Sequence, residues 1–289
     1  MKTNTNLEPS QRLNPLDDFL FYKVMGEKGD EVQLLGFLNA VLGRSGKDRI
    51  ESVEIQENKS FAAEILGGKS CTLDVYAALQ DGTKVNIEVQ LSNEGNMDRR
   101  SLYYWSKLYS RGINKGDNFC ELPDVIAINI VDFNFLPTGS FHSCFHIRED
   151  SDASMILTNA LEIHVVDMVK WRKQRDKDIE NNPLHRWLTW FDRNSSPELI
   201  EKVVAMDLAI MAASERQAFL ARSQELADEM RHEKAYRDDL HRMSNARREG
   251  LAEGKLEIAR NALAQGLPVD MIEKLTGLDG AQIRSLIIN

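Results

Sequence analysis

The stretch CTLDVYAALQDGTKVNIEVQL, residues 71–91, contains two runs in which apolar and polar residues alternate. Alternation with a period of two puts successive side chains on opposite faces of a strand, so each run predicts a strand with one buried face. Both apolar sets share a face only if Ala77 lies opposite Val85. This register leaves the three-residue loop 80–82, in which Gly82 can adopt the left-handed conformation that closes a type I turn. We therefore predict a β-hairpin.

The polar face of this hairpin carries the candidate chemistry. In the same register Asp74 lies opposite Glu88, and Gln90 follows on the same face. Opposed Cβ atoms are roughly 4.5–5.5 Å apart, and two carboxylates at that separation repel each other unless a cation lies between them. Mg²⁺ is commonly held by one or two carboxylates with waters and a phosphate oxygen, and it activates a bound water for phosphodiester hydrolysis. The alternative is a merely solvated hairpin face, whose acids a neighbouring Lys or Arg neutralises.

The remaining patterns divide the chain into an α/β part and an all-helical part. Apolar residues at helical spacing predict two helices within residues 17–42, separated near Gly26 and Gly29. A helix is expected at 97–111. Further strands are expected at residues 53–55, 124–133, 141–147 and 161–169.

Beyond residue 171 only helical patterns remain. They include a long mixed-charge stretch at 215–260, typical of a solvated helix or coiled coil, and two or three short helices at 258–287. The sequence thus predicts an α/β fold followed by an all-α C-terminal region. The expected domains are residues 1–171, a helical extension at 172–248 and a small helical unit at 249–289.

Composition limits the class of protein without naming a function. The net charge of −9 argues against a protein coated in positive charge, although a local basic stripe would suffice for DNA. No segment has the roughly 18 consecutive apolar residues of a membrane span, and the N-terminus is polar. The three cysteines form no CxxC pair, which fits a reducing compartment. We expect a soluble, cytoplasmic protein.

Several blocks of sequence resemble one known family. They are DDFLFYKVMG at 17–26, LLGFLNAVLG at 34–43, LDVYAALQDGTKVNIEVQ at 73–90, MDRRSLYYWSKLYSRGINKGDNF at 97–119, VIAINIVDF at 125–133, LEIHVVDMVKW at 161–171 and PLHRWLTWF at 183–191. Together with the tail at 249–286 they resemble the Rpn family of recombination-promoting nucleases and transposases, within the PD-(D/E)XK nuclease superfamily. The resemblance covers nearly the whole chain, and its most specific part is IEVQ with the Arg-Arg and Tyr-Tyr block after it.

The resemblance implies a restriction-endonuclease-like mixed sheet flanked by helices. It also implies a metal-dependent DNA endonuclease linked to recombination or transposition, with Mg²⁺, or alternatively Mn²⁺, as cofactor. Asp74 matches the first metal-binding acid of the superfamily and Glu88 the second. Gln90 stands where the superfamily usually has Lys, and a glutamine can hold a water but supplies no positive charge. The alternative function is a non-catalytic DNA-binding or interaction protein on a degenerate nuclease fold.

Further residues are candidates for binding DNA or metal. The helix at 97–111 places Arg100, Tyr104, Lys107 and Arg111 on one face, which suits contacts to DNA phosphates but can equally be an ordinary solvated face. Leu102, Trp105, Leu108 and Tyr109 turn elsewhere and can pack on the sheet. Lys23 could reach a phosphate or an active-site acid. The candidate accessory acids are Asp18, Glu31 and Glu64, each of which can also be an ordinary surface or capping charge.

Two features remain open. His142, Cys144 and His146 alternate and so share a strand face, but with no fourth ligand in view a partly buried strand is favoured over a zinc site. The segment 256–287 resembles a small helix-turn-helix element, which could bind DNA, form a homodimer or pack on the long helix.

Overall fold

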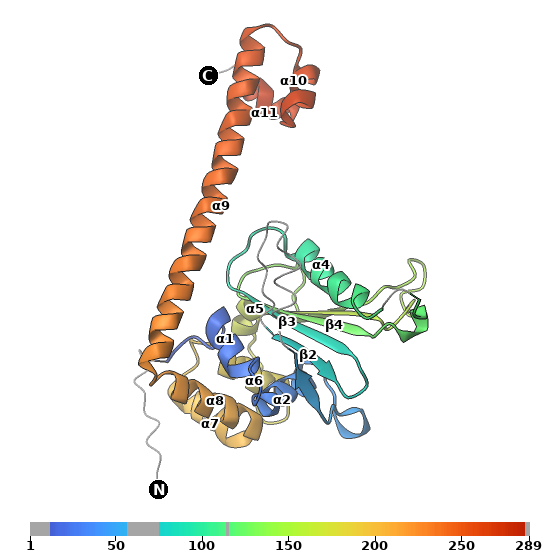
Figure 1. Ribbon diagram of the computed structural model, residues 1–289, viewed down its shortest axis with the longest axis vertical. Coiled ribbons are helices and arrows are strands. Elements are labelled where there is room, and N and C mark those ends of the chain that lie inside the picture. Colours follow the sequence, from blue (N-terminus) through green and yellow to red (C-terminus); the bar gives the residue numbers. More distant parts are fainter. Residues whose placement is uncertain (1–11, 57–74, 114–115, 287–289) are drawn as a thin grey trace. The chain divides into compact units, whose positions relative to one another are not determined.

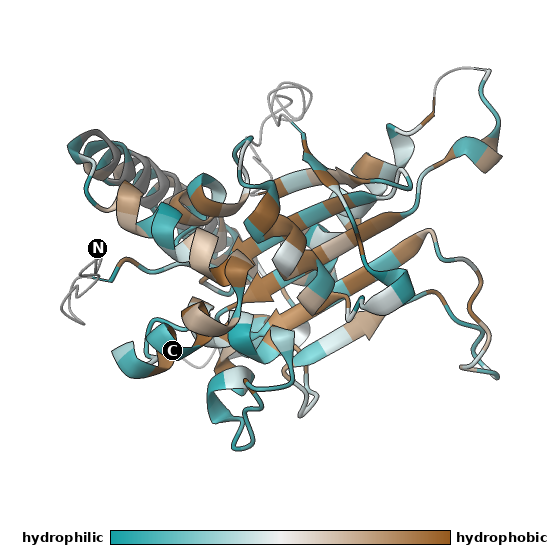
Figure 2. Ribbon diagram, turned by 90° about the horizontal axis from the view of Figure 1, so that it is seen from below, coloured by the Kyte–Doolittle hydropathy of each residue, from teal (hydrophilic) through white to brown (hydrophobic). Residues whose placement is uncertain are grey.

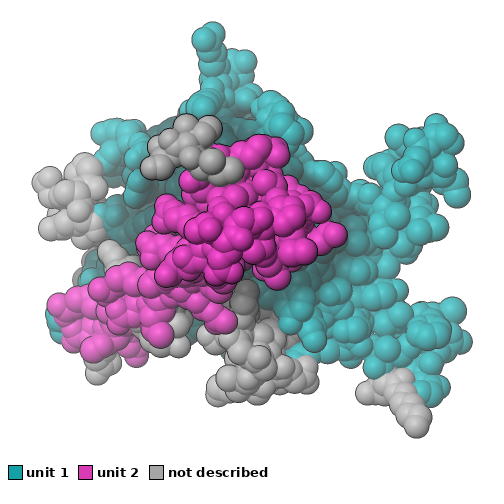
Figure 3. Space-filling view, turned by 90° about the horizontal axis from the view of Figure 1, so that it is seen from above, with its two compact units in different colours: residues 1–226 teal, residues 227–289 magenta. Residues whose placement is uncertain are grey.

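The computed structural model describes residues 12–56, 75–113 and 116–286, and they form two compact units, Met1–Leu226 and Ala227–Asn289 (Figure 3). The helices are α1 (Asp18–Met25), α2 (Glu31–Val41), α4 (Met97–Ser110), α5 (Met168–Lys173), α6 (Pro183–Phe191), α7 (Pro197–Met206), α8 (Leu208–Leu220), α9 (Gln224–Ala264), α10 (Val269–Thr276) and α11 (Gly280–Ser285). The strands are β1 (Val53–Ile55), β2 (Val75–Leu79), β3 (Lys84–Gln90), β4 (Val125–Val131), β5 (His142–Phe145) and β6 (Leu161–Asp167). Two 3₁₀ turns, Gly46–Asp48 and Phe119–Glu121, connect them.

The first unit is built on a mixed six-stranded sheet with the order β1-β2-β3-β4-β6-β5. Strands β3, β4 and β6 are parallel to one another, and the other neighbours are antiparallel. All seven residues of β4 are buried, as expected for a strand covered on both faces. Figure 2 shows apolar residues running along the strands. The predicted α/β fold with a mixed sheet and an all-α C-terminal region is confirmed.

The hairpin β2–β3 has the predicted register. Ala77 lies opposite Val85, and the amide of Leu79 donates a 2.9 Å hydrogen bond to the carbonyl of Thr83. Gly82 has a φ of 87°, in the left-handed region that favours glycine. The three-residue loop therefore aligns the apolar sets of the two strands on one face.

Helices cover both faces of the sheet (Figure 1). Helix α4 lies over one face, and α1, α2 and α6 lie on the other side. Helices α6, α7 and α8 belong to this same unit. The rings of Phe37 in α2 and Trp187 in α6 lie 5.6 Å apart edge to face. A Cβ added at Gly36 would lie 2.3 Å from that of Ala209, so only glycine allows α2 and α8 to approach this closely. The boundary expected at residue 171 thus falls inside the first compact unit.

The second unit has its own small core. Ala259 and Ala262 of α9, Ile272 of α10 and Ile283 of α11 are buried together. Helix α9 has 41 residues, about 60 Å at 1.5 Å per residue, and it is separated from α8 by residues 221–223 instead of continuing from residue 215 as predicted. Among the described residues, no helix is both long and apolar enough to cross a bilayer.

Candidate functional site

Glu88 is a charged residue buried in the sheet. It lies on β3, pairs in register with Asn129 of β4, and is 1% exposed. Neighbouring positions of β3 are apolar and face the opposite side of the sheet, so the alternation of β3 directs Glu88 toward α4. An ionised carboxylate at this depth requires a compensating positive charge.

Arg100 on α4 supplies one such charge. Its Nη2 donates a hydrogen bond of 3.2 Å to Glu88 Oε2, and its guanidinium lies 5.4 Å from the centre of the Tyr104 ring. The Arg100 side chain is 26% exposed, so it contacts both the buried carboxylate of Glu88 and solvent. The sequence predicted Arg100 as a phosphate contact, and the structure places it directly against the acid.

A short polar chain beside Glu88 was not anticipated. Ser101 Oγ donates to Asn129 Oδ1 at 3.0 Å, and Asn129 Nδ2 donates to the carbonyl of His164 at 3.1 Å. The signal for it is present in the sequence, because Asn129 is the one polar residue in the apolar run at 125–131. These bonds fix α4 over β3 and β4, and with them the position of Arg100.

Gln90 ends β3 on the same face as Glu88 and is partly exposed. Its carbonyl accepts a 2.9 Å hydrogen bond from the amide of Asp132, which follows β4. Gln90 therefore lies at the carboxyl edge of the parallel strands, where solvent and a ligand have access.

Two predicted acids cannot be placed. Asp74 and Glu64 lie outside the described residues. The described part of the hairpin ladder ends at the pair Val75 and Ile87, one residue short of Asp74 and Glu88.

The buried face of α4 differs from the prediction at Leu102 and Tyr104. Tyr104 and Leu108 are 1% and 2% exposed and pack on Val125, whereas Leu102 is 51% exposed. Tyr104 is therefore part of the core and does not belong to a solvent-exposed face, which corrects the prediction. Lys107 and Arg111 remain partly exposed on α4 and at its C-cap.

The candidates in the N-terminal helices take part in local contacts. Lys23 Nζ contacts Glu27 Oε1 at 2.7 Å, and the same carboxylate receives Arg216 of α8 at 2.6 Å. Glu31 Oε2 accepts a 2.9 Å hydrogen bond from the amide of Gly29, in the turn before α2. Asp18 lies in the first turn of α1, where an acid is favourable to the helix dipole.

A mixed sheet with a buried acid on its hairpin and helices on both faces is the arrangement of a PD-(D/E)XK nuclease. Residues 15–246 match the model of the PD-(D/E)XK nuclease family transposases, and the chain belongs to that family. Residues 252–287 match the C-terminal helix-turn-helix domain of the Rpn/YhgA-like nuclease family, so the predicted family is confirmed. No curated protein and no solved structure matches the chain.

Proposed function

We propose that the chain is a metal-dependent DNA endonuclease in which Asp74 and Glu88 hold the metal ion. The observation that carries the proposal is the register of the hairpin around the buried Glu88. The described pairs end with Val75 opposite Ile87, as the register predicted from the sequence requires. Asp74, which that register predicts opposite Glu88, lies outside the described residues.

The donor atoms suit a hard divalent cation. Carboxylate oxygens are the protein ligands that Mg²⁺ and Mn²⁺ prefer, and Glu88 is an acid whose burial requires a cationic partner. When bound, such an ion would polarise the scissile phosphate and lower the pKa of an attacking water. We propose Mg²⁺ as the ion, with Mn²⁺ as its substitute.

The neighbouring side chains have separate roles in this proposal. Gln90, at the rim of the sheet, would orient the attacking water through its amide. Arg100 would hold the Glu88 carboxylate in place and, at its exposed edge, contact a DNA phosphate. Lys107 and Arg111 would extend that phosphate contact along α4.

The second unit supports DNA as the substrate. Helices α10 and α11 are joined by residues 277–279, a turn of the length found in helix-turn-helix motifs. Gly277 has a φ of 68° and ends α10, while Asp279 and Gln282 form a capping box that begins α11. This unit would bring the nuclease to DNA in recombination or transposition, and a homodimer through the C-terminal helices would suit cleavage of both strands.

The test is plasmid cleavage by the full chain with Mg²⁺ and with EDTA, using Glu88→Gln as the variant. Glutamine keeps the shape of the side chain, so a loss of cleavage with an unchanged circular dichroism spectrum isolates the charge. Glu54→Gln, at an exposed position of β1, is the matched control and should cleave as the wild type does. Cleavage that persists in Glu88→Gln would place the active site elsewhere.

A non-catalytic DNA-binding protein is the second candidate, because Gln90 replaces the usual Lys and the chain carries a helix-turn-helix domain. A wild-type chain that shifts DNA on a gel but does not cut it with Mg²⁺ or Mn²⁺ would favour this function.

A further inference from the structure

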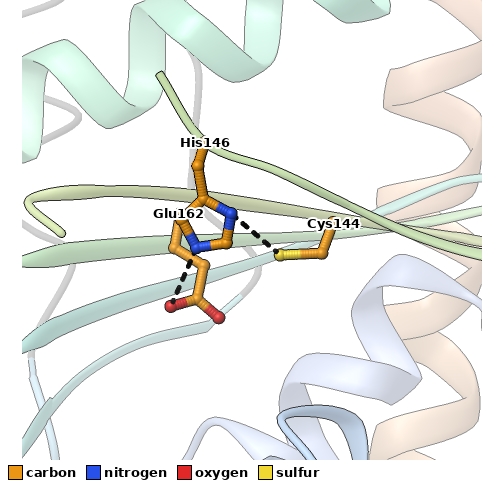
Figure 4. Close-up of side chains that lie close together, drawn as sticks. All are labelled: Cys144, His146 and Glu162. Carbon is orange, nitrogen blue, oxygen red and sulfur yellow. Dashed lines mark hydrogen bonds and ion pairs between the residues drawn. The ribbon is translucent and has the colours of Figure 1, made fainter. Parts of the chain in front are cut away.

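Five potential metal ligands gather on the antiparallel pair β5–β6. Cys144 lies opposite His164 in the ladder, and the same alternation brings His142 and His146 to the face that carries Glu162 and His164. Figure 4 shows Cys144, His146 and Glu162 converging. Three of these residues share one predicted strand at 141–147, and the fold adds Glu162 and His164 from β6.

The side chains of Cys144, His146 and Glu162 lie within reach of one ion. Cys144 Sγ lies 3.8 Å from His146 Nδ1, and the other ring nitrogen of His146, Nε2, lies 4.0 Å from Glu162 Oε2, so the imidazole would turn to place one nitrogen on the ion. One ligand atom from each of the three residues lies within 4.8 Å of the others. Atoms bound to a tetrahedral Zn²⁺ at about 2.0–2.3 Å lie about 3.3–3.7 Å from one another. Small side-chain rotations would therefore bring all three onto an ion.

We propose that Cys144, His146 and Glu162 form a Zn²⁺ site on the β5–β6 edge of the sheet. A thiolate, an imidazole and a carboxylate are the three protein ligand types of zinc, whereas Mg²⁺ and Ca²⁺ do not favour sulfur. The three residues leave a fourth position for a water or an outside ligand.

His164 contacts the proposed ligand Glu162, and His142 in turn contacts His164. His164 Nε2 lies 2.6 Å from Glu162 Oε1, and His164 Nδ1 lies 2.9 Å from His142 Nε2. A histidine that hydrogen-bonds a ligating carboxylate holds it in position, and removal of such a partner typically lowers metal affinity about 10–100-fold. His164 is buried, so its ring is also held by packing.

The zinc site is separate from the proposed nuclease site. Asn129, beside Glu88, lies opposite Val165, and Ile128 lies opposite His164. Because side chains alternate along β4 and β6, His164 and Glu162 face away from α4. The zinc ion would bind the opposite face of the sheet from the Mg²⁺.

A zinc ion at this place would stabilise an edge of the sheet. Strand β5 is a four-residue edge strand, and residues 146–160 return to β6 with an isolated bridge between Arg148 and Ile156. An ion bound by Cys144, His146 and Glu162 would link the two ends of the segment 146–160, and this link would reduce the conformational freedom of the segment.

The test is Zn²⁺ and Co²⁺ binding by the dialysed full chain. Competition with a chromophoric zinc indicator should give about one tight site per chain, and Co²⁺ should produce a thiolate-to-metal charge-transfer band. Cys144→Ser should lose the band and at least about 10-fold in Zn²⁺ affinity, and His164→Ala about 10–100-fold. Cys120→Ser removes another exposed cysteine and should leave both unchanged.

Two results would overturn the site. One is Zn²⁺ affinity that is equal in Cys144→Ser and Cys120→Ser; the other is a wild-type chain that binds Zn²⁺ no more tightly than Cys144→Ser. Should Cys144→Ser prove unfolded by circular dichroism, His146→Ala decides in its place, because His146 follows the last residue of β5 and is only partly buried. Since metal affinity is the readout, failure of nuclease activity does not affect this test.

Discussion

Among single residues, the pair of Glu88 and Arg100 combines stability with the proposed chemistry. The carboxylate is 1% exposed and the guanidinium 26%, so Arg100→Ala leaves a buried acid with less compensating charge. We expect Arg100→Ala to lower the free energy of unfolding by about 1–3 kcal/mol, and Glu88→Gln to remove most of that effect in the double variant. Urea unfolding of the four proteins measures the coupling. Strictly additive losses would show that the pair does not interact.

Asp30 gives the chain a specific dependence on pH. Burial raises its pKa from 3.8 to about 6; the nearby Arg216 and the amide of Glu27 oppose this, and the charges of Glu27 and Glu31 add to it. The folded chain then holds the proton more tightly than the unfolded chain, so this contribution to stability is complete below pH 4 and is lost as the pH rises through 6. We expect wild type to lose about 1–3 kcal/mol relative to Asp30→Asn between pH 4 and pH 7.

Urea unfolding of wild type and Asp30→Asn at several pH values measures this difference. Any hydrogen bond lost in the variant shifts its curve about equally at every pH, so only the change in the gap between the two curves counts. Asp150→Asn, at an exposed position, should run parallel to wild type. A constant gap between wild type and Asp30→Asn would contradict the proposed titration.

At the scale of single elements, the turn of the hairpin holds the register. Gly82 has a φ of 87° with no heavy atom near a would-be Cβ, so Gly82→Ala adds backbone strain without a clash. We expect it to destabilise the chain by about 1 kcal/mol. Gly139→Ala is the matched control, since that glycine is also uncrowded but has no positive φ. Equal melting temperatures for the two variants would show that the turn tolerates the change.

The elements that sequence alone predicted correctly are those defined by local patterns. The register of β2–β3 follows from alternation and loop length, and the break between α1 and α2 follows from Gly26 and Gly29. In α4 the sequence correctly predicted the packing of Trp105, Leu108 and Tyr109. The prediction was wrong for Leu102, which is exposed, and for Tyr104, which is buried. Packing on Val125 selects Tyr104 and exposes Leu102, and that choice depends on residues far along the chain.

The candidate sites show the same limit. Glu88 and Gln90 were found because they share one strand, and the fold confirms that they share its face. The neighbours Ser101 and Asn129, and the approach of Glu162 to Cys144, depend on how α4, β4 and β6 pack. The isolated polar Asn129 marks its own strand in the sequence, but no spacing within one segment predicts which residues of other elements meet it.

At the scale of the whole molecule, positive charge is unevenly distributed between the two proposed DNA-contacting regions. The helix-turn-helix segment 252–287 has four Lys and Arg against five Asp and Glu, whereas residues 97–111 have four against one. Because affinity for the DNA backbone depends on local positive charge, we infer that α4 supplies more of the phosphate contacts than α11 does.

This distribution predicts how DNA affinity depends on salt. Each phosphate contact that is lost lowers the slope of log K against log salt by about 0.9. The double variant Lys107→Gln and Arg111→Gln should therefore bind DNA more weakly and with a slope smaller by up to about 2, whereas Arg284→Gln on α11 should change the slope by about 1 at most. Lys202→Gln, on α7, is the control and should match wild type. A slope reduced more by Arg284→Gln than by the double variant would place the main phosphate contacts on the helix-turn-helix unit and not on α4.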